Sequence, residues 1–332
     1  MNMKKVAING LGRIGRAVFK ILQETEELQL VAVNDLVEPE NLAYLINYDT
    51  AYGRYEKKVE YTEDKILLGE DEFIVYAEED PAGIPWKEHD VDIVFECTGM
   101  FNTRKDLEKH IKAGAKQVIL SAPPKDDTIE MVVFGVNKPS GDNDIISCAS
   151  CTTNCIAPVV EIMDRHLGVE KATLTTVHAY TSTQGIVDSP NKKIRRGRAA
   201  AANFVPTTTG ATKAAVKVLT QLEGKFEGSA IRGPVTVGSI SDMNFVTRKK
   251  ATKKEVNDIF IEETRSERYN KVLAVTNEPL VSSDIIKDSR ASIVDLDMTM
   301  AIDGDLIKVM SWYDNEWGYA CQMIRTAEYL KN

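Results

Sequence analysis

Cysteine and histidine are scarce in this chain, which has five cysteines and four histidines among 332 residues. Five cysteines are too few, and the number is odd, for a disulfide framework, so we expect free thiols and a reducing compartment. Near Cys151 and Cys155 there is no second Cys or His pair at the spacing of a zinc site. We therefore predict no metal centre and leave open a working thiol.

A net excess of positive charge and long apolar runs are also lacking. The net charge is -9, whereas a protein that neutralises duplex phosphates needs a basic excess, so we expect no nucleic-acid partner. No apolar run approaches the roughly 20 residues of a membrane helix, and the N-terminus leads directly into a strand without a signal-like segment. We expect a cytoplasmic protein of two domains, because 332 residues exceed one simple core.

A glycine-rich turn follows the first strand-like run, residues 5–9, and precedes a helical pattern at residues 16–22. Its spacing is G-x-G-x-x-G, which allows a tight turn and a close approach to a pyrophosphate. Asp35 ends the next strand-like run, 20 residues after Gly15, where an acid suits the ribose hydroxyls of NAD. A helix cap or turn residue is the alternative for Asp35. The predicted NAD contacts here are Gly10, Gly12, Arg13, Ile14, Gly15 and Asp35.

Small residues follow two later strand-like runs, residues 91–97 and 117–121, and leave space for a cofactor at the carboxyl edge of a parallel sheet. We therefore add Thr98, Gly99 and Ser121 to the predicted cofactor contacts. Short alternating runs within residues 57–77 indicate antiparallel strands inserted into the wound sheet. A helix is predicted to start near residues 103–106 with a reciprocal cap.

Three of the five cysteines lie in residues 147–155, between a strand-like run and a helical pattern over residues 156–167. The N–H groups and dipole at the start of a helix stabilise a thiolate, so we expect the pKa of Cys151 to be lowered. A fall from about 8.5 to about 6 would raise the thiolate fraction at neutral pH from a few per cent to roughly nine tenths. A buried apolar cysteine is the alternative. Cys155 lies one turn further on, and we expect it to face the core.

His178 ends a β-branched run at residues 171–177. If this strand lies beside the helix that follows Cys151, the imidazole can pair with the thiol and activate it. A core histidine bonded to a carbonyl is the alternative. His89, His110 and His166 stand in polar or helical surroundings, and we expect them at the surface.

Residues 184–206 form a long segment without periodicity that is rich in basic and small residues. Such a segment is often functional, although a charge run is also typical of a solvated face. Threonines at 207–209 precede a helical pattern at 211–222, and hydroxyls at a helix start favour an anion. Arg232 supplies a further cation, and Thr252 with Glu255 predicts a capping box.

Five motifs, at residues 9–16, 149–155, 176–181, 206–210 and 312–319, closely resemble those of phosphorylating glyceraldehyde-3-phosphate dehydrogenase, and the likeness spans the chain in order. The resemblance implies Cys151 as the nucleophile and His178 as its acid-base partner. It implies that Asn315 holds the nicotinamide carboxamide and that Tyr319, in the same motif, is a cofactor contact. It assigns inorganic phosphate to Ser150, Thr152, Thr209 and Gly210, and phosphates of substrate or product to Thr181, Arg198 and Arg232.

The resemblance also implies an α/β fold: a Rossmann-type doubly wound parallel sheet domain and an α+β catalytic domain with a mostly antiparallel sheet. The predicted division is 1–149 for the NAD-binding domain, joined by the C-terminal helix 316–332, and 150–315 for the catalytic domain. The implied activity is NAD-dependent phosphorylating oxidation of glyceraldehyde 3-phosphate by a homotetramer. An erythrose-4-phosphate dehydrogenase and a non-catalytic nucleotide- or RNA-binding protein are the alternatives.

Four places depart from the usual family pattern: Thr183, Ser189, Glu79, and Gly233 with Pro234. Ser189 and Glu79 leave open whether NADP is also accepted. Thr183 and residues 233–234 leave the phosphate geometry open.

Overall fold

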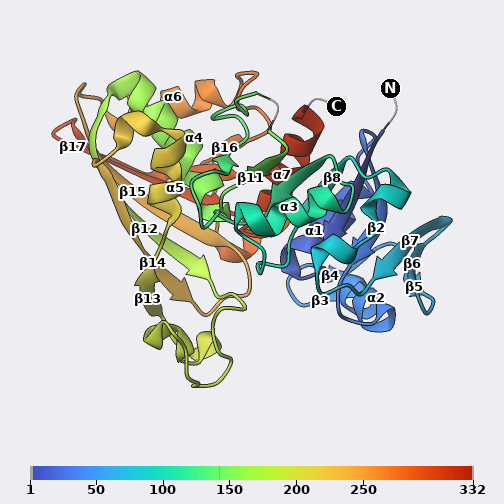
Figure 1. The fold of residues 1–332 in the computed structure, drawn as a ribbon. Helices are drawn as coiled ribbons and strands as arrows, with labels where there is room; N and C mark the ends of the chain where they lie inside the picture. The colour runs from blue at the N-terminus through green and yellow to red at the C-terminus, as the bar shows by residue number, and fades with distance from the viewer. Residues whose placement is uncertain (1–2, 142, 331–332) are drawn as a thin grey trace. The chain divides into compact units, whose positions relative to one another are not determined.

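The structure is a computed structural model that describes residues 3–141 and 143–330. The chain forms two compact units (Figure 1). The first unit comprises residues 1–132, 138–149 and 323–332, and the second comprises residues 133–137 and 150–322. Residues 1–2, 142 and 331–332 of the predicted domain ranges lie outside the described residues.

A nine-stranded sheet, in the order β10-β11-β9-β8-β1-β2-β7-β6-β5, organises the first unit. The strands from β10 to β7 run parallel to their neighbours, which confirms the doubly wound parallel sheet. The central strands β1, β8, β9 and β11 are mostly buried and apolar, as expected where both faces of a sheet are covered. The parallel strands are β1 (Lys4–Asn9), β2 (Leu28–Asn34), β7 (Asp71–Tyr76), β8 (Ile93–Glu96), β9 (Gln117–Leu120), β10 (Glu130–Met131) and β11 (Ile145–Ser147).

The predicted antiparallel insertion is also confirmed. β5 (Val59–Tyr61) and β6 (Lys65–Leu68) pair antiparallel, and β6 pairs antiparallel with β7 at the edge of the sheet. The helices of this unit are α1 (Arg13–Leu22), α2 (Pro39–Asn47) and α3 (Arg104–Lys112), with short 3-10 helices η1 (Pro81–Gly83) and η2 (Trp86–His89) and the small ribbon of β3 (Tyr48–Asp49) and β4 (Gly53–Arg54).

His110 corrects the expectation of a surface histidine. It lies on α3 and is fully buried, with its ring between Trp86 and Glu96. The polar helical surroundings misled the prediction, because α3 carries its charged residues on the outer face and turns His110 and Leu107 inward. The predicted cap at the start of α3 is half present: the Thr103 hydroxyl accepts from the N–H of Asp106. The Asp106 carboxylate accepts from the Thr103 hydroxyl, so the cap is not reciprocal through the backbone.

A seven-stranded sheet in the order β13-β14-β12-β15-β18-β17-β16 organises the second unit. Four of its six pairings are antiparallel, and only β12 with β14 and β16 with β17 are parallel. The mostly antiparallel sheet is therefore confirmed. Its strands are β12 (Val169–Ala179), β13 (Val205–Thr208), β14 (Phe226–Gly233), β15 (Ser239–Thr247), β16 (Leu273–Thr276), β17 (Ser292–Ile302) and β18 (Leu306–Tyr313).

The long helix α4 (Cys151–Leu167) packs against this sheet and forms the core with it (Figure 1). Burial alternates along β15, so that Met243 and Phe245 face the core, as a strand covered on one face requires. α4 begins five residues earlier than the helical pattern predicted, because Ser150 caps it. The other helices are α5 (Ala211–Val218), α6 (Lys253–Glu263), α7 (Trp317–Tyr329), η3 (Ile194–Gly197), η4 (Ala200–Ala202), η5 (Thr220–Leu222) and η6 (Ser282–Ile285).

α5 is shorter than predicted, and the remainder of its pattern forms η5. α6 starts with the predicted capping box of Thr252 and Glu255. In the part of the chain that the structure describes, no helix combines the length and apolar character needed to cross a bilayer.

Candidate active site

The glycine-rich turn between β1 and α1 has the geometry of a pyrophosphate cradle. Gly10 adopts a positive φ of 93°, and a Cβ there would lie 2.8 Å from the backbone nitrogen of Thr98. A Cβ on Gly15 would lie 1.9 Å from the carbonyl oxygen of Gly10, so only glycine permits this packing. Gly12 faces open space, and no side chain caps α1 there. The helix start therefore suits an anionic group such as a dinucleotide pyrophosphate.

Asp35 follows β2 and is held against this turn. One carboxylate oxygen accepts from the N–H of Leu11 at 2.7 Å, and the other accepts from the N–H of Val37 at 3.0 Å. The acid thus lies beside the glycine turn at the carboxyl edge of the sheet. Arg13 at the start of α1 pairs with Asp49 and stacks over the Tyr52 ring, and Ile14 is partly exposed beside it.

The predicted residues Thr98, Gly99 and Ser121 lie at the same edge. Thr98 and Gly99 follow β8, and Ser121 follows the adjacent β9. The N–H of Ser121 donates to the carbonyl of Glu96 at 3.0 Å, which ties the ends of the two strands together. Ligands of open parallel sheets bind at this edge, so the first unit gathers most of its predicted cofactor contacts where a dinucleotide is expected.

Cys151 is the first residue of α4. The Ser150 hydroxyl caps the helix by accepting from the N–H of Thr153 at 3.1 Å, and Ala149 before it has a left-handed φ of 55°. This turn leaves Cys151 half-buried at the helix start. Cys155 is fully buried in the core, as predicted, and burial raises the pKa of its thiol to about 12.

The thiol of Cys151 lies against the imidazole of His178. Their Sγ and Nε2 atoms are 3.4 Å apart, although 27 residues separate them in the chain. His178 reaches the thiol from β12 and is 6% exposed. The pair has the geometry of a nucleophile with its general base.

The titration of this pair differs from the sequence-based expectation. Burial raises the pKa of the Cys151 thiol, while Arg232, the Thr152 hydroxyl and nearby N–H groups act in the opposite direction. The helix start thus moderates the effect of burial without reversing it. Burial, together with the charge of Arg232, lowers the pKa of His178 to about 3. The resting pair at pH 7 is therefore a neutral thiol beside a neutral imidazole.

Arg232 lies on β14 directly beside His178, because the parallel register of β12 and β14 pairs the two residues. Its Nη1 is 2.6 Å from His178 Nδ1 and 2.9 Å from the carbonyl oxygen of Ala179, to which it donates. That carbonyl is also 2.6 Å from His178 Nδ1. A guanidinium can only donate, so a proton on Nδ1 makes Arg232 and His178 two donors that share the Ala179 carbonyl as their acceptor. In that arrangement Nε2 is free to accept from the thiol.

Thr152 and Tyr313 are buried residues that lie beside Cys151 and His178. The Tyr313 hydroxyl is 2.9 Å from both the Thr152 and Thr176 hydroxyls. The Tyr313 ring packs edge-on against His178 with centroids 6.0 Å apart. These contacts fix the orientation of the imidazole.

A cationic cluster lies in the same unit, formed by Lys193, Arg196 and Arg232. Arg196 donates to the Thr207 hydroxyl at 3.0 Å and to the Thr183 hydroxyl at 3.3 Å. Burial lowers the pKa of all three cations, and mutual repulsion lowers the pKa of Lys193 and Arg196 further. None of the three pairs with a carboxylate among the described residues. Cations without a carboxylate, beside threonine hydroxyls, suit phosphate.

Of the other residues predicted to bind phosphate, Thr181 joins the cationic cluster and Arg198 does not. The Thr181 hydroxyl is 2.9 Å from that of Thr183 and so joins the cluster. Thr209 accepts from the N–H of Ala211 at the start of α5, and Gly210 beside it faces open space. Arg198, in contrast, pairs with Asp188 at 2.8 Å on an exposed face. The structure brings Arg196 into the cluster where the resemblance placed Arg198.

Asn315 and Tyr319 come from the end of the second unit. The side-chain oxygen of Asn315 accepts from the N–H of Gly238 at 3.2 Å and from the Ser239 hydroxyl at 2.9 Å. This fixes the orientation of its amide, whose NH₂ group has no partner among residues 3–141 and 143–330. Tyr319 is 3% exposed on α7.

The sequence did not single out Arg196, Lys193 or Tyr313. Arg196 and Arg198 stand two residues apart in one basic run, and nothing local distinguishes them. Only the turn that forms η3 directs Arg196 to Thr207 and leaves Arg198 with Asp188. Tyr313 falls within the family motif at residues 312–319, but its position beside His178 depends on the register of β18 with β15.

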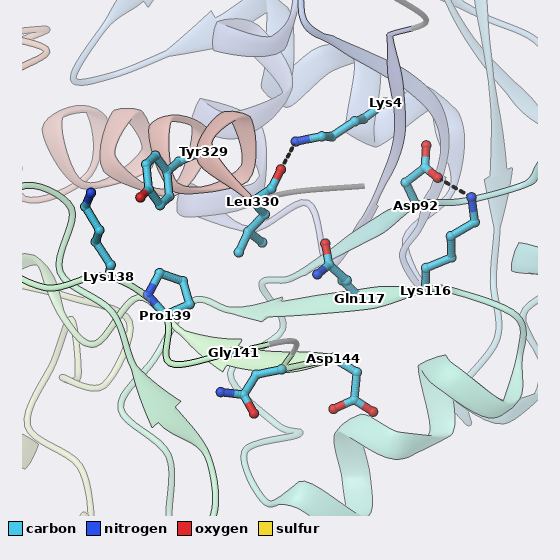
Figure 2. A pocket seen from close by; sticks show the side chains of 11 residues that line it. Lys4, Asp92, Lys116, Gln117, Lys138, Pro139, Gly141, Asp144, Tyr329 and Leu330 are labelled. Atoms are coloured by element: carbon cyan, nitrogen blue, oxygen red, sulfur yellow. Dashed lines mark hydrogen bonds and ion pairs between the residues drawn. The ribbon is translucent and has the colours of Figure 1, made fainter.

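A pocket of about 670 Å³ in the first unit contains none of the predicted site residues (Figure 2). It lies at the amino ends of the parallel strands, opposite the glycine turn. Lys4 there donates to the carbonyls of Ala327 and Glu328 at the end of α7 and to that of Leu330 just after it. Lys116 pairs with Asp92 at 2.7 Å. These lysines already have partners, and ligands of such sheets bind at the other edge.

Two family models match the N-terminal and C-terminal parts of the chain separately. A family model described as the NAD-binding domain of glyceraldehyde 3-phosphate dehydrogenase matches residues 4–104, and one described as its C-terminal domain matches residues 150–315. The chain is 45% identical over 332 residues to a glyceraldehyde-3-phosphate dehydrogenase of Streptomyces coelicolor, covering 99% of this chain and 98% of the relative. It is also 45% identical over 332 residues to that of Thermotoga maritima, covering 99% of both chains.

Proposed function

The chain belongs to the glyceraldehyde-3-phosphate dehydrogenase family, and we propose that it oxidises glyceraldehyde 3-phosphate with NAD and inorganic phosphate to 1,3-bisphosphoglycerate. The observation that carries this proposal is the Cys151–His178 pair, with Sγ 3.4 Å from Nε2, beside the carboxylate-free cationic cluster. A thiol with a base suits acyl chemistry, and the cations suit two phosphates.

In the first half-reaction, His178 Nε2 takes the thiol proton as Cys151 Sγ attacks the aldehyde carbon. His178 returns that proton to the carbonyl oxygen, which gives a hemithioacetal and leaves the imidazole neutral again. His178 then accepts the hydroxyl proton as the hydride leaves that carbon, and a thioester on Cys151 remains. A neutral imidazole is required at each acceptance, which agrees with its lowered pKa. Proton transfer of this kind contributes about 10²–10⁴-fold in rate.

In the second half-reaction, an oxygen of inorganic phosphate attacks the thioester carbon and the Cys151 thiolate leaves. The product is an acyl phosphate, so the thioester conserves the energy of oxidation. We assign the inorganic phosphate to Ser150, Thr152, Thr209 and Gly210. We assign the substrate phosphate to Thr181, Arg196 and Arg232.

NAD supplies the hydride acceptor of this reaction. The open helix start at Gly12 suits its pyrophosphate and Asp35 suits its ribose hydroxyls. The NH₂ group of Asn315 is oriented to donate to a carboxamide oxygen. We assign the remaining contacts to Gly10, Arg13, Ile14, Gly15, Thr98, Gly99, Ser121 and Tyr319.

NADH formation from glyceraldehyde 3-phosphate tests the proposal, with phosphate present, omitted or replaced by arsenate. We expect steady turnover only with phosphate or arsenate, because the thioester otherwise remains on Cys151. The same assay with erythrose 4-phosphate and with NADP compares the alternatives. Equal rates with and without phosphate, or no NADH formation, would contradict the proposed reaction.

We also propose the organisation that the family implies. Residues 1–149 with 316–332 bind NAD, residues 150–315 carry out catalysis, and four copies assemble into a homotetramer in the cytoplasm. The family-model matches at residues 4–104 and 150–315 support the two functional ranges.

A further inference from the structure

Three adjacent parallel strands of the first unit end in polar residues that are bonded to one another. Asn9 ends β1, Asn34 ends β2 and Glu96 ends β8, and the strand register places them side by side. Asn34 donates to the Asn9 side-chain oxygen at 2.8 Å, and Asn9 donates to Glu96 Oε2 at 2.6 Å. All three are at most 4% exposed. Such a buried polar chain is costly unless each member has a partner.

Behind Glu96 lie His110 from α3 and Trp86 from η2, both fully buried. The indole of Trp86 can only donate, and its Nε1 lies 3.0 Å from His110 Nδ1. Nδ1 therefore accepts, and the ring proton stays on Nε2. His110 Nε2 then donates to Glu96 Oε2 at 3.1 Å. Trp86 thus determines which tautomer of His110 faces Glu96.

The other oxygen of Glu96 holds the loop after β8. Glu96 Oε1 accepts from the N–H of Thr98 at 2.8 Å and from the Thr98 hydroxyl. Together with Asn9 and His110, these donors give the carboxylate four hydrogen bonds. Thr98 is the residue against which Gly10 packs, since a Cβ on Gly10 would lie 2.8 Å from Thr98 N. Glu96 therefore connects the glycine turn to the buried histidine and tryptophan.

We propose that Glu96, oriented by His110 and Trp86, is a positioning residue for the dinucleotide, which holds Thr98 and the Gly10 turn in their binding geometry. The inference rests on the proposed function only in taking NAD as the ligand. His110 and Trp86 are fully buried, so they act through Glu96 and Thr98 and make no contact with the cofactor. A binding loop whose geometry is held before binding loses less freedom on binding, which increases affinity.

Two substitutions in the full chain test this. His110→Gln replaces the fixed ring donor with a flexible amide, and Trp86→Phe removes the N–H that fixes the His110 tautomer. Both therefore release the orientation of Glu96 from buried positions. We expect the Kd for NAD, measured by calorimetric titration, to rise by about tenfold, or about 1.4 kcal/mol. The KM for NAD should rise in parallel. The kcat at saturating NAD and the KM for the aldehyde should stay within about twofold of wild type.

His89→Gln is the matched control. His89 lies on the same short helix as Trp86 and bonds the Tyr76 hydroxyl at 2.6 Å, but in the part of the chain that the structure describes it forms no hydrogen bond with Glu96 or Thr98. We expect it to leave the Kd for NAD unchanged even if it lowers the melting temperature. If His110→Gln and Trp86→Phe behave like the control, with a lower melting temperature and the wild-type Kd, the network is merely structural and the proposal is overturned.

Thr98 supplies a second test through coupling. Thr98→Val removes the hydroxyl donor to Glu96. We expect it to weaken NAD binding in the wild-type background and to add little in a Trp86→Phe background, because both changes act on the same carboxylate. Fully additive losses in the Kd for NAD would contradict the proposal. Because the Kd is measured without turnover, loss of the proposed activity in wild type would leave this result interpretable.

Discussion

At the scale of single residues, two cysteines one helical turn apart have opposite environments. Cys151 is half-buried at the first position of α4 and touches His178, whereas Cys155 faces the core. We expect Cys151→Ser to abolish phosphate-dependent turnover while NAD binding, measured by titration, is retained. Cys155→Ala should lower stability by a few kcal/mol at most and leave turnover of the folded protein. Near-normal turnover of the serine variant would contradict the assignment of the nucleophile.

The charge of Arg232 sets a pH dependence. Arg232 lowers the pKa of Cys151, so Arg232→Gln should raise it. Only the thiolate reacts with iodoacetamide, and it forms as the pH rises through the pKa. The midpoint of Cys151 alkylation should therefore move to higher pH in the variant. Arg195→Gln, an exposed arginine of the same loop, is the control, and an unchanged midpoint in Arg232→Gln would argue against the charge effect.

Two arginines of the basic loop should differ in substrate binding. Arg196 bonds the threonines of the cationic cluster, while Arg198 is held by Asp188. We expect Arg196→Gln to raise the KM for glyceraldehyde 3-phosphate by about tenfold or more, the effect of losing one charge-assisted bond of about 1.5–3 kcal/mol. Arg198→Gln should change it little. The reverse order in steady-state kinetics would favour the assignment made from the motif alone.

At the scale of elements, α4 is anchored by a buried acid network. Glu161 on α4 accepts from Arg165 at 2.9 Å, from Arg268 at 2.9 Å and from the Tyr269 hydroxyl at 2.7 Å. Arg268 also donates to the carbonyls of Gly135 and Val136. The network therefore ties the segment at residues 133–137 to the helix that carries Cys151.

Removing one donor of this network should cost stability. Tyr269→Phe leaves an oxygen of Glu161 short of a partner in a buried site, so we expect the free energy of unfolding to fall by about 1–3 kcal/mol. Denaturant unfolding measures it. Tyr61→Phe, which removes an exposed hydroxyl bond to Glu40, should change stability by about 0.5 kcal/mol or less. Equal losses would indicate that burial of the network contributes nothing.

At the scale of the whole molecule, the number of copies in the assembly is the testable quantity. The proposed homotetramer predicts a particle of about four times 36.9 kDa, measured by light scattering on a sizing column. Large exposed apolar side chains, among them Ile186, Ile194 and Phe204 in the long loop, agree with a surface that is covered on assembly. A mass equal to one chain at micromolar concentration would contradict the tetramer.

Local patterns in the sequence were enough to predict the elements that depend on neighbours in the chain. The glycine turn between a strand and a helix, the capping box of α6 and the inward-facing Cys155 all follow from spacing within a few residues, because backbone sterics and helix periodicity act over that range. The parallel sheet of the first unit follows from such patterns, whereas the mostly antiparallel sheet of the second unit was predicted from the family resemblance. Both are confirmed.

Only the tertiary structure decided which distant side chains meet. The register of β12 with β14 brings Arg232 to His178, and packing of α4 brings Cys151 to the same imidazole. Burial then raises the pKa of the thiol, a desolvation effect that a helix start alone does not predict. The inward turn of His110 depends likewise on its partners Trp86 and Glu96, which lie 24 and 14 residues away. Sequence spacing determines the elements, but desolvation and pairing are properties of the packed chain.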